Sequence, residues 1–122
     1  MQDNMESQGL PGLDENLQKA VMELLVLRIM DRRELNIGEL AETIHEISGG
    51  VLNIVFPYAA MYRMESAGYI RECGKRIAPD GRRRQYFQIT EAGRQRLELL
   101  LSIYRRFMQG VDRILDEEAD RS

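Results

Sequence analysis

A long apolar repeat near the C-terminus constrains the fold more than any other feature of the sequence. Its members alternate in steps of three and four residues: Leu97, Leu100, Tyr104, Phe107, Val111 and Ile114. This heptad spacing predicts a helix over residues 91–116 that is on the order of 37 Å long. A 122-residue chain forms a domain too small to cover such a rod. We therefore expect the repeat to form a homodimer interface, packed as in a helix bundle.

Three shorter helices are predicted upstream from apolar residues spaced three and four apart. The first begins near Asp14, which can serve as its N-cap. The second spans Ile37–Ile47 and follows Asn36, another residue that caps helices well. The third spans Asn53–Ala67 and ends at Gly68, because glycine suits a helix C-terminus. In this third helix one set of side chains is expected to face the core: Ala60, Met61 and Met64. A second set is expected to face outward: Tyr58, Tyr62, Arg63 and Glu65.

Two short strands are predicted next, at Tyr69–Ile77 and Arg84–Ile89, with Pro79-Asp80-Gly81 between them. Proline presets one φ angle and glycine tolerates a positive one, so this tripeptide predicts a tight turn and a hairpin. Thr90 is then the expected N-cap of the long helix. The predicted fold class is mainly α with a small β-hairpin, arranged as a winged helix-turn-helix with a long C-terminal dimerisation helix.

The chain divides into four predicted parts. They are a flexible leader at 1–12, a winged-helix domain at 13–90, the dimerisation helix at 91–116 and a frayed acidic tail at 117–122. No segment approaches the roughly 18 apolar residues needed to cross a bilayer, and the polar start does not resemble a signal peptide. We therefore expect a cytoplasmic protein that does not bind membranes.

Positive charge is concentrated in one segment of an otherwise acidic chain. The net charge is -3, yet residues 63–96 carry nine Lys or Arg and four Asp or Glu. This segment includes the end of the third helix and the whole hairpin, so the charge predicts one basic face. The only cysteine, Cys73, and the only histidine, His45, provide no metal-ligand cluster. We predict no metal or other cofactor, and no enzyme, because no nucleophile, phosphate-loop or paired-carboxylate motif is present.

Three segments resemble the PadR family of transcription regulators. Residues 81–93, GRRRQYFQITEAG, are similar to the family's wing signature Gly-Arg-Pro-Arg-Lys-Tyr-Tyr-x-Leu-Thr-x-x-Gly, with Arg83 in place of proline. Residues 58–70 resemble its recognition helix, and residues 48–50 match a frequent turn. The resemblance covers most of the folded chain. It implies a homodimer that binds a pseudo-palindromic operator in double-stranded DNA, usually as a repressor released by a small-molecule effector.

The third helix and the hairpin are therefore the predicted DNA-binding elements. We expect the recognition surface to include Asn53, Phe56, Tyr58, Tyr62 and Arg63. We expect the DNA backbone to be held by Lys75, Arg82, Arg83 and Arg84. An alternative function is a winged-helix protein-protein interaction module. That module would favour an exposed apolar patch on the same face, whereas DNA binding needs basic residues on both elements.

Overall fold

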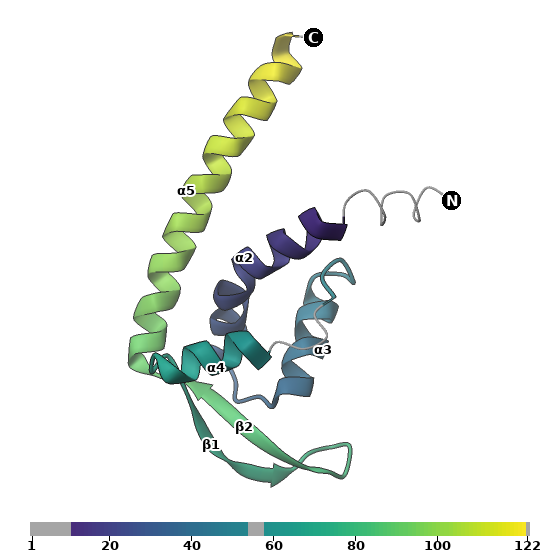
Figure 1. The fold of residues 1–122 in the computed structure, drawn as a ribbon, viewed down its shortest axis with the longest axis vertical. Coiled ribbons are helices and arrows are strands. Elements are labelled where there is room, and N and C mark those ends of the chain that lie inside the picture. The colour runs from purple at the N-terminus through teal and green to yellow at the C-terminus, as the bar shows by residue number, and fades with distance from the viewer. Residues whose placement is uncertain (1–10, 54–57, 122) are drawn as a thin grey trace, which may run out of the picture.

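The computed structural model describes residues 11–53 and 58–121. Its elements are α2 (Pro11–Met30), α3 (Ile37–Ile47), α4 (Tyr58–Ser66), β1 (Ile70–Ile77), β2 (Arg83–Ile89) and α5 (Glu91–Arg121). Four helices and one antiparallel hairpin confirm the predicted fold class. Figure 1 shows α5 leaving the compact part of the molecule as a single rod, with the hairpin at the opposite end.

Helix α2 lies at the centre of the core. It contacts α3, α4, α5 and β2. The most deeply buried side chains belong to several of these elements: Val26, Leu27, Met30, Leu40, Met64 and Ile70. Burying each such side chain stabilises the fold by roughly 1.5–3 kcal/mol. The apolar side chains of α2 therefore pack mostly within the protomer.

Three predicted helix boundaries are wrong. Helix α2 begins at Pro11, so Asp14 lies inside it; proline is tolerated in a first turn, where its missing N–H has no intrahelical partner. Helix α5 continues to Arg121, because Glu and Ala favour helix and no glycine or proline follows Leu115. Asn53 precedes α4 in an irregular segment, because the backbone N–H of the adjacent Leu52 donates to Ser48 Oγ (3.0 Å) at the end of α3. Residues 1–10 of the predicted leader, residues 54–57 and residue 122 lie outside the described part.

Asn36 caps α3 as predicted. Its side-chain Oδ1 accepts a hydrogen bond from the Glu39 backbone N–H (2.9 Å), and Glu39 Oε1 accepts one from the Asn36 N–H (3.2 Å). This reciprocal capping box pairs two N–H groups that the helix itself cannot pair. Asn36 is also buried, so its side chain has little access to water.

We expect Asn36→Ala to lower the free energy of unfolding by about 1 to 2 kcal/mol, because it leaves the Glu39 N–H without its partner. Chemical denaturation followed by circular dichroism measures this change. Gln95→Ala, at an exposed position within α5, is the control and should stay within about 0.5 kcal/mol of the wild type. Equal stability of the two variants would contradict the assigned role of the cap.

Gly68 and Thr90 join the hairpin to the helices on either side. Gly68 has φ of 82°, and the Tyr69 N–H donates to the Met64 carbonyl (2.8 Å), which closes the C-terminus of α4. Thr90 Oγ1 accepts from the Gly93 N–H (3.0 Å) and caps α5, and Thr90 Oγ1 also donates to the Gly68 carbonyl (2.6 Å). Both predicted caps are confirmed, and they meet at the base of the hairpin.

Besides the pairing of its two strands, the hairpin pairs with one residue of the loop between α2 and α3, which the sequence pattern did not predict. Ile70 pairs with Ile89 and Ile77 with Arg83, with a bulge between Glu72 and Gly74. Leu35, between α2 and α3, forms an isolated bridge with Phe87: each N–H donates to the other's carbonyl, at 3.1 and 2.9 Å. A lone two-stranded hairpin is marginally stable, so this bridge helps to hold it against the helices. Within the described residues, no helix has the length and apolar character needed to span a membrane.

Candidate nucleic-acid interface

Helix α4 presents one buried face and one exposed face. Ala60, Met61 and Met64 are buried in the core, as predicted. The opposite face is exposed and carries Tyr58, Tyr62, Arg63 and Glu65. Tyr62 is 73% exposed, so it is not a core residue of the protomer. Two large amphipathic rings and an arginine are thus exposed on the outer face of this helix.

The nine cations of residues 63–96 fall into two groups. Four of them form ion pairs with acidic residues: Arg76–Glu34 (2.6 Å), Arg84–Asp80 (2.7 Å), Arg94–Asp31 (3.1 Å) and Arg96–Glu23 (2.7 Å). By contrast, the described residues offer no ion-pair partner to the other five, which are all exposed: Arg63, Arg71, Lys75, Arg82 and Arg83. The basic face is therefore narrower than the charge count indicates, and its unpaired cations lie on α4 and the hairpin.

One ion pair holds the hairpin against the loop between α2 and α3. Arg76 Nη2 donates to Glu34 Oε1, and its guanidinium lies 4.1 Å from the centroid of the Tyr86 ring. The Glu34 hydrogen bond raises the pKa of Arg76. Both partners are partly exposed, so the pair contributes little to stability.

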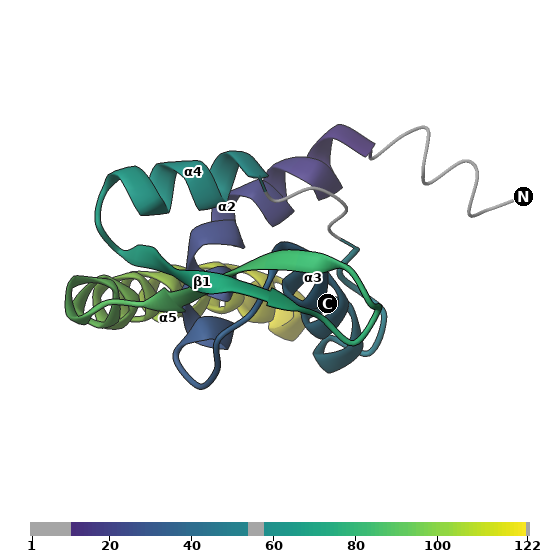
Figure 2. The same ribbon diagram turned by 90° about the horizontal axis from the view of Figure 1, so that it is seen from below.

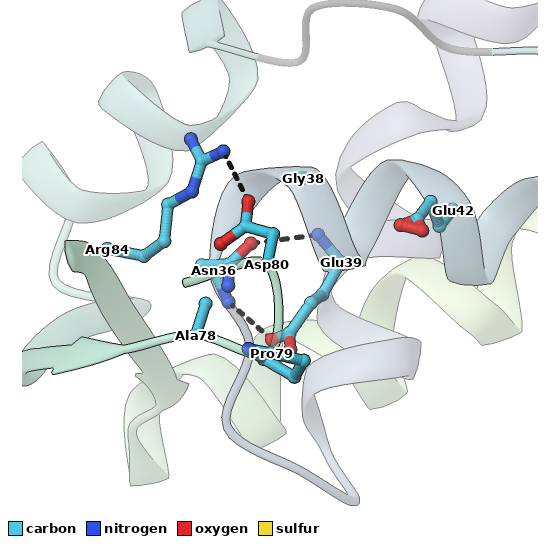
Figure 3. A pocket seen from close by; sticks show the side chains of 8 residues that line it. All are labelled: Asn36, Gly38, Glu39, Glu42, Ala78, Pro79, Asp80 and Arg84. Atoms are coloured by element: carbon cyan, nitrogen blue, oxygen red, sulfur yellow. Dashed lines mark hydrogen bonds and ion pairs between the residues drawn. The ribbon is translucent and has the colours of Figure 1, made fainter. Parts of the chain in front are cut away.

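The tip of the hairpin is organised around Asp80. Asp80 Oδ1 accepts from the Arg82 backbone N–H (3.0 Å), and Asp80 Oδ2 accepts from Arg84 Nη2 (2.7 Å). These two hydrogen bonds lower the pKa of Asp80 and the second raises that of Arg84. Figure 3 shows the Asp80 and Arg84 side chains meeting beside the start of α3, where Asn36 and Glu39 form the capping box. Figures 1 and 2 both place the hairpin tip next to α3.

A surface groove joins three elements at this point. It is lined by the start of α3 (Asn36, Ile37, Gly38), by Tyr58 at the start of α4, and by Arg83, Arg84 and Gln85 of β2. The structure thus brings together three predicted site residues: Tyr58, Arg83 and Arg84. The beginning of α3 was missed as part of the site, although the spacing of Asn36 and Glu39 in the sequence is that of a capping box. Backbone N–H groups at such a helix start favour anionic groups.

The other predicted DNA-binding residues are more scattered. Asn53 is exposed beyond α3, Lys75 and Arg82 are exposed on the hairpin, and Tyr62 and Arg63 lie farther along α4. Phe56 lies outside the described residues. The predicted surface is therefore spread over α4 and the hairpin, with the groove between them.

The predicted dimer residues do not all lie on one surface. Leu97 is only 5% exposed and belongs to the protomer's own core, because the first turns of α5 pack on α2. The prediction that Leu97 belongs to the dimer interface is therefore corrected: it is a core residue of the protomer. Leu100 is half-buried against the core and Val111 is half-buried, whereas Tyr104, Phe107 and Ile114 are exposed. Leu99, Ile103 and Leu115 are exposed as well. We define the α5 face as Leu99, Ile103, Tyr104, Phe107, Val111, Ile114 and Leu115.

Comparison with known proteins gives consistent matches. The model of the transcriptional regulator PadR-like family matches residues 26–99. A transcriptional regulator from Streptococcus is 28% identical, with 80% of this chain and 95% of that chain covered and a TM-score of 0.67. A PadR-like transcriptional regulator from Bacillus cereus is 22% identical, with coverage of 82% and 96% and a TM-score of 0.69. Bacillus subtilis PadR, solved in complex with operator DNA, is 18% identical, with coverage of 66% and 46% and a TM-score of 0.57. No curated protein shows a significant match to the sequence.

Proposed function

Because the chain belongs to the PadR-like family of transcriptional regulators, we propose that it binds a specific DNA operator as a homodimer. The observation that carries this proposal is the placement of unpaired cations. Arg63 on α4 and Lys75, Arg82 and Arg83 on the hairpin are exposed. The two elements flank one groove at the start of α3, so a single duplex can contact both.

In the proposed complex α4 enters the major groove, which is about 12 Å wide and admits a helix. Tyr58, Tyr62 and Arg63 then face base edges and nearby phosphates. The hairpin follows the DNA backbone, where Lys75, Arg82, Arg83 and Arg84 neutralise phosphates. Asn53 and Phe56 precede α4 and complete the proposed recognition surface. The similarity in fold to Bacillus subtilis PadR, solved with operator DNA, supports this arrangement.

The α5 face supplies the proposed dimer interface. Phe107 and Ile114 are 67% and 68% exposed within the protomer, which leaves an extended apolar strip in water. Such a strip marks an interaction surface, and a two-fold axis through it would pair two copies of the chain. Two α4 helices related by that axis would read two half-sites of a pseudo-palindrome. Family membership further supports repression of a promoter in the cytoplasm, with release by a small-molecule effector.

Selection of bound duplexes from a random pool, followed by affinity measurements over a salt series, tests the function directly. We expect a two-fold motif with half-sites about one helical turn apart. We also expect at least about a thousand-fold tighter binding to it than to scrambled DNA. If no motif emerges and all duplexes bind equally weakly, the chain is not a sequence-specific regulator by itself. A protein-protein interaction module would then be the leading function.

The double variant Arg82→Ala/Arg83→Ala tests the hairpin as a phosphate contact. We expect weaker binding to every duplex, and a salt slope lower by about 1.8 per half-site if each arginine neutralises one phosphate. Fluorescence anisotropy at several salt concentrations measures both quantities. The matched control is Arg105→Ala/Arg113→Ala, which removes the same charge from exposed positions of α5. Figure 1 shows this helix extending away from the hairpin. An unchanged slope in the hairpin variant would exclude this contact.

A further inference from the structure

We propose that Asp80 is an internal stand-in for a DNA phosphate: it holds Arg84 in the free protein, and DNA binding exchanges the Asp80–Arg84 ion pair for a phosphate–Arg84 pair. Asp80 is thus a positioning residue that sets the affinity of the hairpin for the DNA backbone. The inference rests on the proposed function, and it assigns a role to an acidic residue at the centre of a surface that should attract anions.

The geometry fixes Asp80 within reach of Arg84. The Gly81 N–H donates to the Ala78 carbonyl (2.8 Å), which closes the turn, and Gly81 has φ of 84°. Asp80 Oδ1 accepts a hydrogen bond from the Arg82 N–H (3.0 Å), which orients its carboxylate over the tip. The second oxygen, Oδ2, is then left for Arg84 Nη2 at 2.7 Å. Both carboxylate oxygens are therefore used within the hairpin.

The pair is placed where it can exchange with a phosphate. The side chains of Arg84 and Asp80 are 40% and 48% exposed, and an exposed pair of this kind is held weakly. A phosphate can offer two oxygens to the guanidinium fork, a stronger contact than the single hydrogen bond to Asp80. Arg84 also lines the groove that contains Tyr58 and the start of α3, so a phosphate in that groove would be within its reach.

Arg84 has an acidic partner, whereas the two arginines that precede it do not. Within the described residues, the side chains of Arg82 and Arg83 have no acidic partner and are ready to meet DNA. A second groove, between α3 and the hairpin tip, is lined by Glu39 and Glu42 together with Asp80 and Arg84. Of its three acidic residues, Asp80 alone forms an ion pair with Arg84. Two arginines at the tip are thus free, and a third has to give up an intramolecular carboxylate before it binds a phosphate.

A double-mutant cycle on DNA affinity tests this exchange, with the selected operator duplex as probe and Asp80→Asn, Arg84→Ala and the double variant as proteins. Asparagine keeps the oxygen that accepts the Arg82 N–H but loses the charge. Asp80→Ser is a second variant that also retains an acceptor for this turn. Glu42→Gln is the matched control, because it removes one negative charge from an exposed residue of the same groove.

We expect Asp80→Asn to raise the affinity by roughly two- to five-fold more than Glu42→Gln does. We expect Arg84→Ala to lower the salt slope by about 0.9 per half-site. In the Arg84→Ala background the gain from Asp80→Asn should fall to that of the control. The proposal is overturned if the gain persists without Arg84, or if Arg84→Ala changes neither affinity nor slope. Because Arg82 and Arg83 are tested separately, either of these results leaves the proposed DNA binding standing, whereas a wild type that binds no duplex rejects both.

Discussion

Replacing Gly93 with alanine is expected to lower the free energy of unfolding by about 3 kcal/mol or more. This is the largest loss of stability that we predict for a single substitution. A Cβ atom at this position would lie 2.1 Å from the Tyr69 carbonyl oxygen and 2.7 Å from Ile89 Cγ1. The carbonyl cannot retreat easily, because it accepts a hydrogen bond from the Thr90 N–H (3.0 Å). The start of α5 would have to move away from the hairpin.

Thermal or chemical unfolding of the variant measures this loss. The matched control is Gly110→Ala in the same helix, where a Cβ would meet no atom of the protomer within 4 Å. Alanine favours helix over glycine by about 1 kcal/mol, so the control should be as stable as the wild type or slightly more stable. Equal stability of the Gly93 variant and the wild type would show that α5 does not need this close approach.

Replacing Phe107 with aspartate is expected to convert the proposed homodimer into a monomer and to weaken binding to the proposed operator by about 100- to 10,000-fold, since two half-sites would no longer act together. Phe107 is 67% exposed on the α5 face and makes no contribution to the core cluster of the protomer. The monomer should therefore keep its fold. Analytical ultracentrifugation measures the mass, and anisotropy with the operator duplex measures the affinity.

Gln109→Asp is the control for this experiment. Gln109 is exposed on α5 two residues beyond Phe107 and lies on another side of the helix. The substitution therefore introduces the same charge away from the α5 face. It should remain a dimer with unchanged operator affinity. A Phe107→Asp protein that stays dimeric would place the dimer interface elsewhere on the molecule, without affecting the proposed role of α4 and the hairpin.

The order and type of the elements could be predicted because the signals are local. The caps at Asn36, Gly68 and Thr90 depend on atoms within a few residues along the chain, and all three were found in their expected roles. The apolar spacing of α4 likewise placed Met61 and Met64 in the core. These features arise from helix geometry, which repeats regularly and can be read from spacing alone.

The limits of the candidate site could not be predicted, because they depend on contacts between distant residues. Arg76 meets Glu34 across 42 positions, Arg94 meets Asp31 across 63, and Arg96 meets Glu23 across 73. A count of charges along the sequence treats these arginines like Arg82 and Arg83. The tertiary fold distinguishes them by giving each a carboxylate partner.

The sequence by itself determined the succession of helices and hairpin, the turn at Gly81, the exposed face of α4 and the presence of a helix longer than its domain. Each depends on local propensity or regular periodicity. The tertiary structure decided which cations are unpaired, that Leu97 belongs to the core, that Leu35 adds a bridge to the hairpin, and that the start of α3 meets Arg83 and Arg84 in one groove. These are decided only in the folded state, because packing brings together residues whose separation along the chain carries no such information.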